Sequence, residues 1–439
     1  MFPENFVWGA STSSYQIEGA VDVDGRGKSI WDTYSHTPGR IKNGDTGDIA
    51  CDHYHRWPED VELLARGGFT AYRFSVAWPR ILPDGAGAVE QRGLDFYDRL
   101  VDGLASRGIT PWLCLYHWDL PQVLQDKGGW VSRVTAQTFA DYAAVVAKRL
   151  GDRVKHWATF NEPNVHAMFG YGDGSHAPGV KGLPNMLAAM HHQNLGHGRA
   201  VQALRAEGTD FRVGSIVALQ RIRPSADRDE DRRAVERFDA MWNGACLDPL
   251  KLGRYPDAVA ADFAPLIMAD DLVTMHQPID FVGMNFYGPI YAQDAPASLF
   301  GAWFGPRPSD MPVTAMGWPV DPTALTEQLI RVSERYDRPD IYVTENGACY
   351  DDTVGTDGTV HDQARLAYLR DHLNAAQRAI PAGVNLRGYF VWSLLDNFEW
   401  SEGFSRRFGI VRVDFNTLRR TPKASYQWLS EFFARQKRR

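Results

Sequence analysis

Eight short apolar segments alternate along the chain with longer segments of helical periodicity. Strands that are apolar on both faces and alternate with helices are typical of a parallel sheet that helices cover on both sides. Eight such units predict an α/β fold made of one closed (β/α)8 TIM barrel, and periodicity alone leaves an open doubly wound sheet as the alternative. The predicted strands span residues 6–11, 71–76, 110–116, 156–161, 212–219, 280–287, 341–346 and 387–394.

The clearest helical segments are amphipathic. Residues 94–108, 135–151 and 361–379 each place apolar side chains on one face and charged side chains on the other. The second segment ends with Lys148 and then Gly151. A basic residue and a glycine favour the end of a helix, so the pattern predicts both the helix and its C-terminus.

No linker interrupts this alternation, so we expect one domain over residues 1–439. The longest segments without clear periodicity are 11–57, 162–183 and 288–321, and each follows a predicted strand. Long irregular segments in a compact domain are usually functional. In a barrel the loops after the strands form the active face, and these long loops are therefore predicted to form the mouth of an active site.

The composition excludes several classes of protein. The chain has 439 residues, of which 44% are hydrophobic and 23% charged, as in ordinary globular proteins. A net charge of −7 argues against nucleic acid or anionic membranes as partners. No segment approaches 18 apolar residues, and the first residues lack the pattern of a secretory signal. Four widely spaced cysteines form no disulfide or zinc pattern, so we expect reduced, buried thiols in a cytoplasmic protein.

Polar and aromatic residues gather where the predicted strands end. In a barrel these positions converge on one mouth although they are far apart in the sequence. A single arginine in a strand is most often a structural ion-pair residue, and a single tryptophan there is most often part of the core. Their joint placement favours a site, whose candidate residues are Arg73, His117, Asn161, Glu162, Asn285, Tyr287, Glu345, Trp392, Glu399 and Trp400.

Two glutamates suggest the chemistry of this site. Glu162 in TFNEP and Glu345 in VTENG end the fourth and seventh predicted strands. One glutamate at a strand end is usually a solvated carboxylate, but a pair in different environments can divide the roles of acid and nucleophile. Glycoside hydrolysis with retained configuration uses two carboxyl groups separated by about 5–5.5 Å.

Other catalytic patterns are missing from the sequence. There is no His-Glu-x-x-His pattern, and the histidine groups 53/55 and 191/192/197 fall in loops or helices, where polar packing is their usual role. No Gly-x-Ser-x-Gly motif occurs, and the segment GYGDG (170–174) lacks the spacing of phosphate-binding or dinucleotide-binding loops. We therefore expect neither a metal nor a cofactor.

Five motifs in order along the chain resemble those of glycoside hydrolase family 1, the β-glucosidase group. The similarity extends from residue 2 to beyond residue 428. The motifs are FVWGASTSSYQIEGA (6–20), YHWDLP (116–121), TFNEP (159–163), VTENG (343–347) and VWSLLDNFEW (391–400).

The resemblance implies a role for each matching residue. Glu162 would be the general acid and later the base, and Glu345 the nucleophile, with Arg73 and Tyr287 beside it. Asn161 matches the residue that binds the sugar 2-hydroxyl. The other matches would surround the sugar: Gln16, His117 and Glu399 as ligands of its hydroxyl groups, Trp400 as a further donor, Trp392 as the platform beneath it, and Asn285 near the reaction centre.

Two residues narrow the implied substrate. Glu162 is a carboxylic acid where the thioglucosidase branch carries glutamine, which favours O-glycosides because their leaving groups need a proton. Glu399 is retained where branches acting on 6-phosphorylated sugars usually replace it, which favours unphosphorylated sugars. Trp318 resembles a tryptophan of the aglycone site, His176 on the loop after the fourth strand is a further candidate for that site, and the pair 303–304 (Trp-Phe) offers candidate aromatics at its rim. The alternative is that each of these residues anchors its own loop.

The prediction is a retaining, exo-acting β-glycosidase that removes terminal non-reducing β-D-glucosyl residues. Its partners would be small-molecule β-glycosides or short oligosaccharides, and the sequence leaves the oligomeric state open. The alternatives within the same chemistry are a β-galactosidase, a β-fucosidase or a transglycosylase. A non-catalytic sugar-binding barrel and a metal-dependent barrel hydrolase are the alternatives from other classes.

Overall fold

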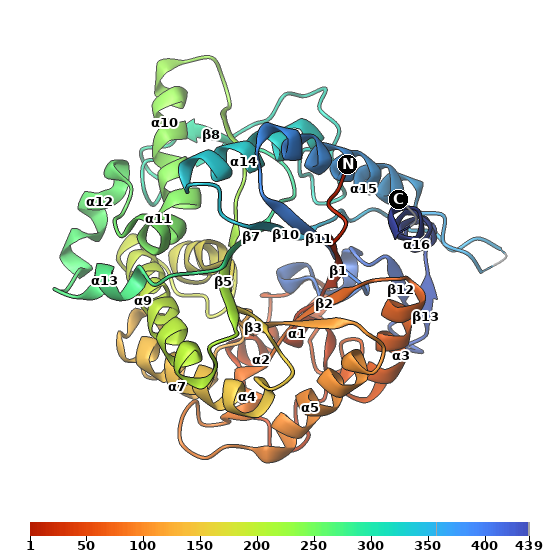
Figure 1. The fold of residues 1–439 in the computed structure, drawn as a ribbon. Helices are drawn as coiled ribbons and strands as arrows, with labels where there is room; N and C mark the ends of the chain where they lie inside the picture. The colour runs from red at the N-terminus through yellow and green to blue at the C-terminus, as the bar shows by residue number, and fades with distance from the viewer. Residues whose placement is uncertain (357, 438–439) are drawn as a thin grey trace.

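Eight parallel strands close into a barrel in the computed structural model, which describes residues 1–356 and 358–437 (Figure 1). Neighbouring strands follow the chain order, and β1 pairs with both β2 and β11, which closes the sheet. The predicted (β/α)8 barrel is therefore confirmed, and the open sheet is excluded. The barrel strands are β1 (Val7–Ser11), β2 (Ala71–Ser75), β3 (Thr110–Tyr116), β4 (His156–Asn161), β5 (Arg212–Ala218), β7 (Phe281–Asn285), β10 (Ile341–Asn346) and β11 (Leu386–Trp392).

Helices form a ring around the barrel (Figure 1). The predicted helix 94–108 begins earlier, because the Glu90 carboxylate accepts a hydrogen bond from the amide of Arg92 and so caps the helix at Gln91. The helices of eight or more residues are α3 (His53–Arg66), α5 (Gln91–Ala105), α7 (Val134–Leu150), α9 (Leu183–Glu207), α10 (Asp229–Asp239), α11 (Ala245–Leu252), α14 (Pro322–Arg335), α15 (Gln363–Ala379) and α16 (Ala424–Lys437).

The long loops after the strands are more ordered than the sequence predicted. The segment 11–57 holds a capping box, in which the side chains of Ser29 and Asp32 each bind the other's amide. The loops contain α1 (Ser14–Ile17), α2 (Ile30–Ser35), α4 (Trp78–Ile81), α6 (Gln122–Gln125), α8 (Pro163–Val165), α12 (Asp257–Phe263) and α13 (Asp271–Met275). They also contain two small sheets, β6 (Ile222–Pro224) with β8 (Ile290–Asp294) and β9 (Ala302–Phe304), and β12 (Val411–Val413) with β13 (Arg420–Pro422).

Single helical turns complete the connections. Two of them are π-helical, which is frequent at functional sites. The π-helical segments are η3 (His166–Gly172) and η4 (Ala240–Gly244), and the 3₁₀ turns are η1 (Lys42–Gly44), η2 (Gly129–Val131), η5 (Ala264–Leu266), η6 (Ile380–Ala382) and η7 (Trp400–Ser405).

The barrel interior is layered. An aromatic cluster fills it near the beginning of the strands, where the Trp112 ring lies 4.6 Å from that of Tyr342 and 5.2 Å from that of Phe390. A second cluster contains the small side chains of Cys114 and Ala158. Beyond them, towards the strand ends, the interior is polar. The two layers nearer the beginning of the strands are closed by apolar packing, so a ligand can enter only at the carboxyl ends of the strands.

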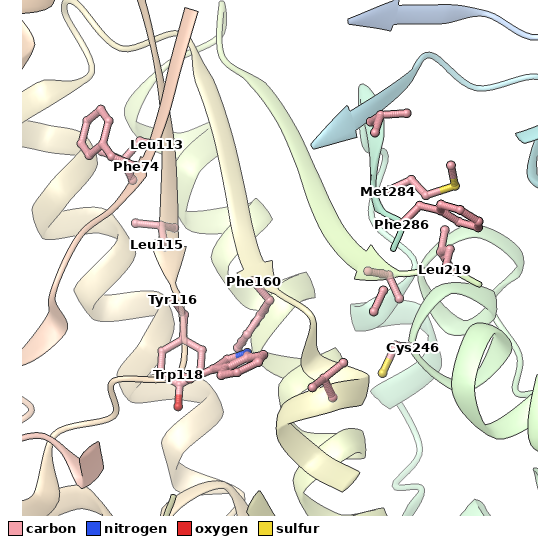
Figure 2. Close-up of a cluster of buried hydrophobic side chains, with 14 of the residues drawn as sticks. Phe74, Leu113, Leu115, Tyr116, Trp118, Phe160, Leu219, Cys246, Met284 and Phe286 are labelled. Atoms are coloured by element: carbon pink, nitrogen blue, oxygen red, sulfur yellow. The ribbon is translucent and has the colours of Figure 1, made fainter. Parts of the chain in front are cut away.

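A second apolar layer lies between the strands and the helices. Leu113 and Leu115 alternate with interior residues along β3 and join this layer, together with Phe160 and Met284 (Figure 2). All four cysteines are buried and unpaired, as predicted. Among the described residues, no helix is long and apolar enough to cross a membrane.

Gly347, directly after β10, permits a close contact between two strand ends. A Cβ atom at this position would lie 1.7 Å from the carbonyl oxygen of Trp392. We expect Gly347→Ala to lower the free energy of unfolding by about 1–3 kcal/mol, because backbone atoms cannot move aside as a flexible side chain can. Urea denaturation measures the change. Gly196→Ala in α9 is the control, since the nearest atom there is 3.3 Å away, and an equal loss in both variants would contradict the argument.

Candidate active site

A cavity of about 900 Å³ opens at the carboxyl ends of the barrel strands. Its lining is mostly apolar, with several aromatic rings, and includes the carboxyl groups of Glu162, Glu345 and Glu399. Most of the residues that the sequence singled out reach its surface. These are His117, Glu162, His176, Tyr287, Trp318, Glu345, Trp392, Glu399 and Trp400.

Four predicted site residues lie behind this surface instead. Gln16, Arg73, Asn161 and Asn285 are at most 1% exposed, and each is engaged in hydrogen bonds within the protein. Arg73, Asn161 and Asn285 bind residues that line the cavity, whereas Gln16 binds the segment that precedes Glu399. Direct contact of Gln16, Asn161 or Asn285 with a ligand stays a prediction.

The Glu345 carboxylate is held by two donors. Arg73 Nη1 donates to its Oε1 at 2.6 Å, and Tyr287 Oη donates to its Oε2 at 2.6 Å. Burial raises the pKa of Glu345, whereas both donors oppose that increase because they stabilise the charged form. Burial and the nearby carboxylates hold the pKa of Tyr287 well above its ordinary value, so the phenol keeps its proton.

Glu162 lies in a different environment. Among the described residues it has no cationic partner, and its Oε1 accepts a hydrogen bond from Asn285 Nδ2 at 2.9 Å. Burial, and then the negative charge of Glu345, raise its pKa to about 8. The Asn285 amide lowers the pKa of both carboxyl groups, which places the two groups around one side chain. At neutral pH Glu162 therefore carries a proton, and Glu345 is the group of the pair whose charged form the protein stabilises.

Asn161 connects this pair to His117. Its Oδ1 accepts from Arg73 Nη2 at 2.5 Å and from Asn285 Nδ2 at 3.0 Å, and its Nδ2 donates to His117 Nε2 at 3.0 Å. Burial, and then the charge of Arg73, hold the pKa of His117 well below its ordinary value. The neutral ring accepts at Nε2, so its proton is on Nδ1, which has no partner among the described residues.

Glu399 adds a third carboxyl group to the cavity. Burial, and then the charges of Glu345 and Glu162, raise its pKa to about 8. Its Oε2 has no hydrogen-bond partner within the described parts of the chain. Burying a carboxyl oxygen without a hydrogen-bond partner costs free energy. Such an oxygen is typical of a site that binds a polar ligand.

Aromatic rings enclose this polar centre. The rings of Trp392 and His117 lie 5.8 Å apart at 24°, and Trp400 lies 4.6 Å from Trp118. Trp318 packs 5.2 Å from the ring of Tyr287 on the outer wall. Flat apolar surfaces beside carboxyl groups suit the apolar face and the hydroxyl groups of a sugar ring.

The sequence predicted only some of the residues on the wall of the cavity that contains His176. His176 lines it beside Trp118, at 5.7 Å between rings, and burial lowers the pKa of this histidine to about 4. Of the two candidate rim aromatics, Phe304 lines the cavity, whereas Trp303 packs against Phe300 and Phe304.

The sequence missed several lining residues. Phe169 and Trp242 come from the two π-helical segments, and Gln220 follows β5. None of these positions belongs to a motif or to a periodic pattern. Only the turn that the chain makes in each loop brings them to the cavity.

The histidine groups have structural partners. His53 contacts Asp60 at 2.8 Å, and His191 contacts Asp271 at 2.9 Å. His197 contacts the Thr159 hydroxyl at 2.7 Å. The predicted polar packing is confirmed for these three. Within residues 1–356 and 358–437 there is no group of three or more His, Cys, Asp or Glu side chains that could hold a metal ion.

Comparison with known proteins decides the family. The family described as "Glycosyl hydrolase family 1" matches residues 1–438. The chain belongs to this family. It is 49% identical to beta-glucosidase A of Thermotoga maritima over 437 residues, which are 98% of this chain and 97% of that protein. It is 46% identical to a bifunctional beta-D-glucosidase/beta-D-fucosidase of Bifidobacterium breve, over 99% of this chain and 98% of that protein.

Solved structures of this glycoside hydrolase family have the same fold. The family 1 b-glucosidase from Thermotoga maritima matches with a TM-score of 0.95 at 47% identity, covering 99% of this chain and 98% of that one. The same enzyme in complex with deoxynojirimycin matches with a TM-score of 0.95 at 47% identity, covering 99% of both chains. The resemblance drawn from the five motifs is thus confirmed over the whole length.

The two carboxyl environments predict a pH profile. We expect kcat/KM to fall as the pH rises through about 8, because Glu162 then loses its proton, and to fall in acid as Glu345 gains one. Glu162→Ala should lack the alkaline decrease on an aryl glucoside whose leaving group needs no proton.

The control for this profile is Glu399→Gln. Glu399 also has a pKa of about 8, so its removal separates the two groups, and the variant should keep the alkaline decrease. An alkaline decrease that disappears in Glu399→Gln but persists in Glu162→Ala would show that Glu162 is not the titrating acid.

Proposed function

We propose that this glycoside hydrolase is a retaining, exo-acting β-glucosidase in which Glu162 is the acid/base and Glu345 the nucleophile. The observation that carries the proposal is the contrast between two carboxyl groups at one cavity. Arg73 and Tyr287 stabilise the charge of one, while burial keeps a proton on the other. The whole chain is proposed to act as one domain, since the family match extends over residues 1–438.

In the first step a Glu345 oxygen attacks the anomeric carbon. The bond from that carbon to the leaving-group oxygen breaks, and this oxygen takes the proton of Glu162. In the second step the Glu162 carboxylate takes a proton from water, the water oxygen attacks the same carbon, and Glu345 leaves. Two inversions at one carbon give a product with the original configuration.

The remaining predicted residues would bind the sugar in the inner cavity. Trp392 would lie beneath the ring, and Glu399 would accept hydrogen bonds from hydroxyl groups with its unpaired oxygen. His117 would donate from Nδ1, and Trp400 from its indole. Gln16, Asn161 and Asn285 would support these groups from behind the surface. Direct hydrogen bonds from these three side chains to the bound sugar are also proposed.

Glucose is the proposed sugar, and the proposed substrates are small-molecule β-glycosides or short oligosaccharides. Relatives named beta-glucosidase A and 1,4-beta-D-glucan glucohydrolase, each 49% identical to this chain, support this choice. Activity on β-fucosides is a second candidate, because one relative is named a bifunctional beta-D-glucosidase/beta-D-fucosidase. Transfer to a second sugar uses the same intermediate and would compete with hydrolysis.

The nucleophile is tested with Glu345→Gly. We expect turnover of an activated aryl β-glucoside to fall on the order of 10⁴-fold or more, because the intermediate cannot form. Azide should restore turnover and give the α-glucosyl azide, since it attacks from the side that Glu345 occupied. NMR of the product identifies its configuration. An unchanged rate, or a product of β configuration, would remove Glu345 from the proposed role.

The sugar is tested with a panel of nitrophenyl β-glycosides, followed by cellobiose. We expect kcat/KM to be highest for the glucoside, with the fucoside within about tenfold of it and the galactoside lower. Loss of one good polar contact costs about 1–3 kcal/mol, which corresponds to the differences expected within the panel. A higher value for any other sugar would contradict glucose as the preferred one.

A further inference from the structure

A buried cluster of charged side chains lies outside the cavity and has no part in the proposed chemistry. It joins the loops after β10 and β11 to α15 and to the segment before α16. Except for Arg407, its side chains are at most 1% exposed. We call it the Asp396 cluster, and its members are Asp352, Asp362, Arg365, Asp396, Arg407 and Lys423.

Asp396 is the centre of this cluster. Lys423 Nζ donates to its Oδ1 at 2.7 Å, and Arg407 Nη1 donates to its Oδ2 at 2.7 Å. The amide of Gly409 donates to Oδ1 at 3.0 Å. Burial would raise the pKa of Asp396, but the charges of Lys423 and Arg407 hold it below its ordinary value. The carboxylate is therefore ionised, and every contact restrains the backbone that carries it.

The outer members hold the cluster in place. Arg365 Nη1 donates to Asp352 at 2.9 Å and to Asp362 at 2.6 Å, and Asp352 also pairs with Lys423. Three carboxylates thus face three cations. A balanced, fully hydrogen-bonded arrangement is the condition under which buried charges are tolerated.

The segment that follows Asp396 carries the predicted sugar ligands Glu399 and Trp400 and binds a third, Gln16. Gln16 Nε2 donates to Asn397 Oδ1 at 3.1 Å and to the carbonyl of Phe398 at 2.9 Å. Glu399 comes next in the chain, and its Oε2 has no partner among the described residues. Since no such bond holds this oxygen, the position of the carboxyl group depends on the backbone of residues 396–400.

We propose that Asp396 and Lys423 are positioning residues that set the sugar specificity by fixing Glu399 and Gln16. The inference rests on the proposed function and deepens it. In the proposed function Glu399 accepts hydrogen bonds from sugar hydroxyl groups, and we assign to it the hydroxymethyl group, whose recognition a shift of segment 396–400 would alter. Glu162 and Glu345, which act on the anomeric carbon, lie at the ends of β4 and β10, so the same shift affects them less.

The test compares a β-D-glucoside with a β-D-xyloside, which lacks the hydroxymethyl group, as nitrophenyl derivatives. We expect Asp396→Asn to lower kcat/KM for the glucoside at least tenfold and to lower the glucoside-to-xyloside ratio at least fivefold. Lys423→Met should change the ratio in the same direction. A merely structural role would lower both substrates together and leave the ratio unchanged, which would overturn the inference.

Asp248→Asn is the matched control. Asp248 is equally buried and charge-paired, but its hydrogen bonds go to Arg335 and Tyr336 at the end of α14. This variant should lose stability without a change in the ratio. If Asp396→Asn does not fold, Arg407→Met replaces it, since Arg407 is 23% exposed and its removal leaves Lys423 in place. An unchanged ratio in Arg407→Met then overturns the inference.

A double variant tests whether Asp396 acts through Glu399. In a Glu399→Gln background, Asp396→Asn should lower the ratio by a smaller factor than in the wild type, because the part of its effect that acts through Glu399 is already lost. An additive decrease would show that Asp396 acts by another route. A wild-type protein inactive on both glycosides contradicts the proposed function, whereas an active one with an unchanged ratio contradicts only the positioning role.

Discussion

The buried guanidinium of Arg73 is the interaction on which the site depends. It starts on β2 and reaches Glu345 on β10 and Asn161 on β4, so it joins three strands across the inside of the barrel. A buried cation is stabilised by an adjacent anion, so Arg73 favours the charged form of Glu345. That charge in turn raises the pKa of Glu162. Arg73, together with Tyr287, thus decides which carboxyl group holds the proton.

Three residues that line the cavity have an unfavourable backbone conformation. Trp118, Glu162 and Trp400 all line it, and all have a positive φ, which costs about 1–3 kcal/mol for a residue other than glycine. In our proposal the Asp396 cluster restrains the segment that ends in one of these residues, Trp400.

The barrel could be predicted because its pattern is local. Each strand is a short apolar run and each main helix has a period of its own, so the eight strands and the helices 135–151 and 361–379 were located within two residues. The long loops could not be predicted in this way. Their order depends on individual contacts, such as the capping box of Ser29 and Asp32, which have no repeating pattern.

The sequence by itself determined the strand order, the family motifs and the identity of the two glutamates, since these depend on residue type and spacing. Only the tertiary structure decided their chemical states. Glu162 directly follows β4 and Glu345 lies at the end of β10, and their environments differ because Arg73 and Tyr287 contact Glu345 and not Glu162. Phe169, Trp242 and the Asp396 cluster also emerged only in three dimensions, because their partners are distant in sequence and close only after the barrel has formed.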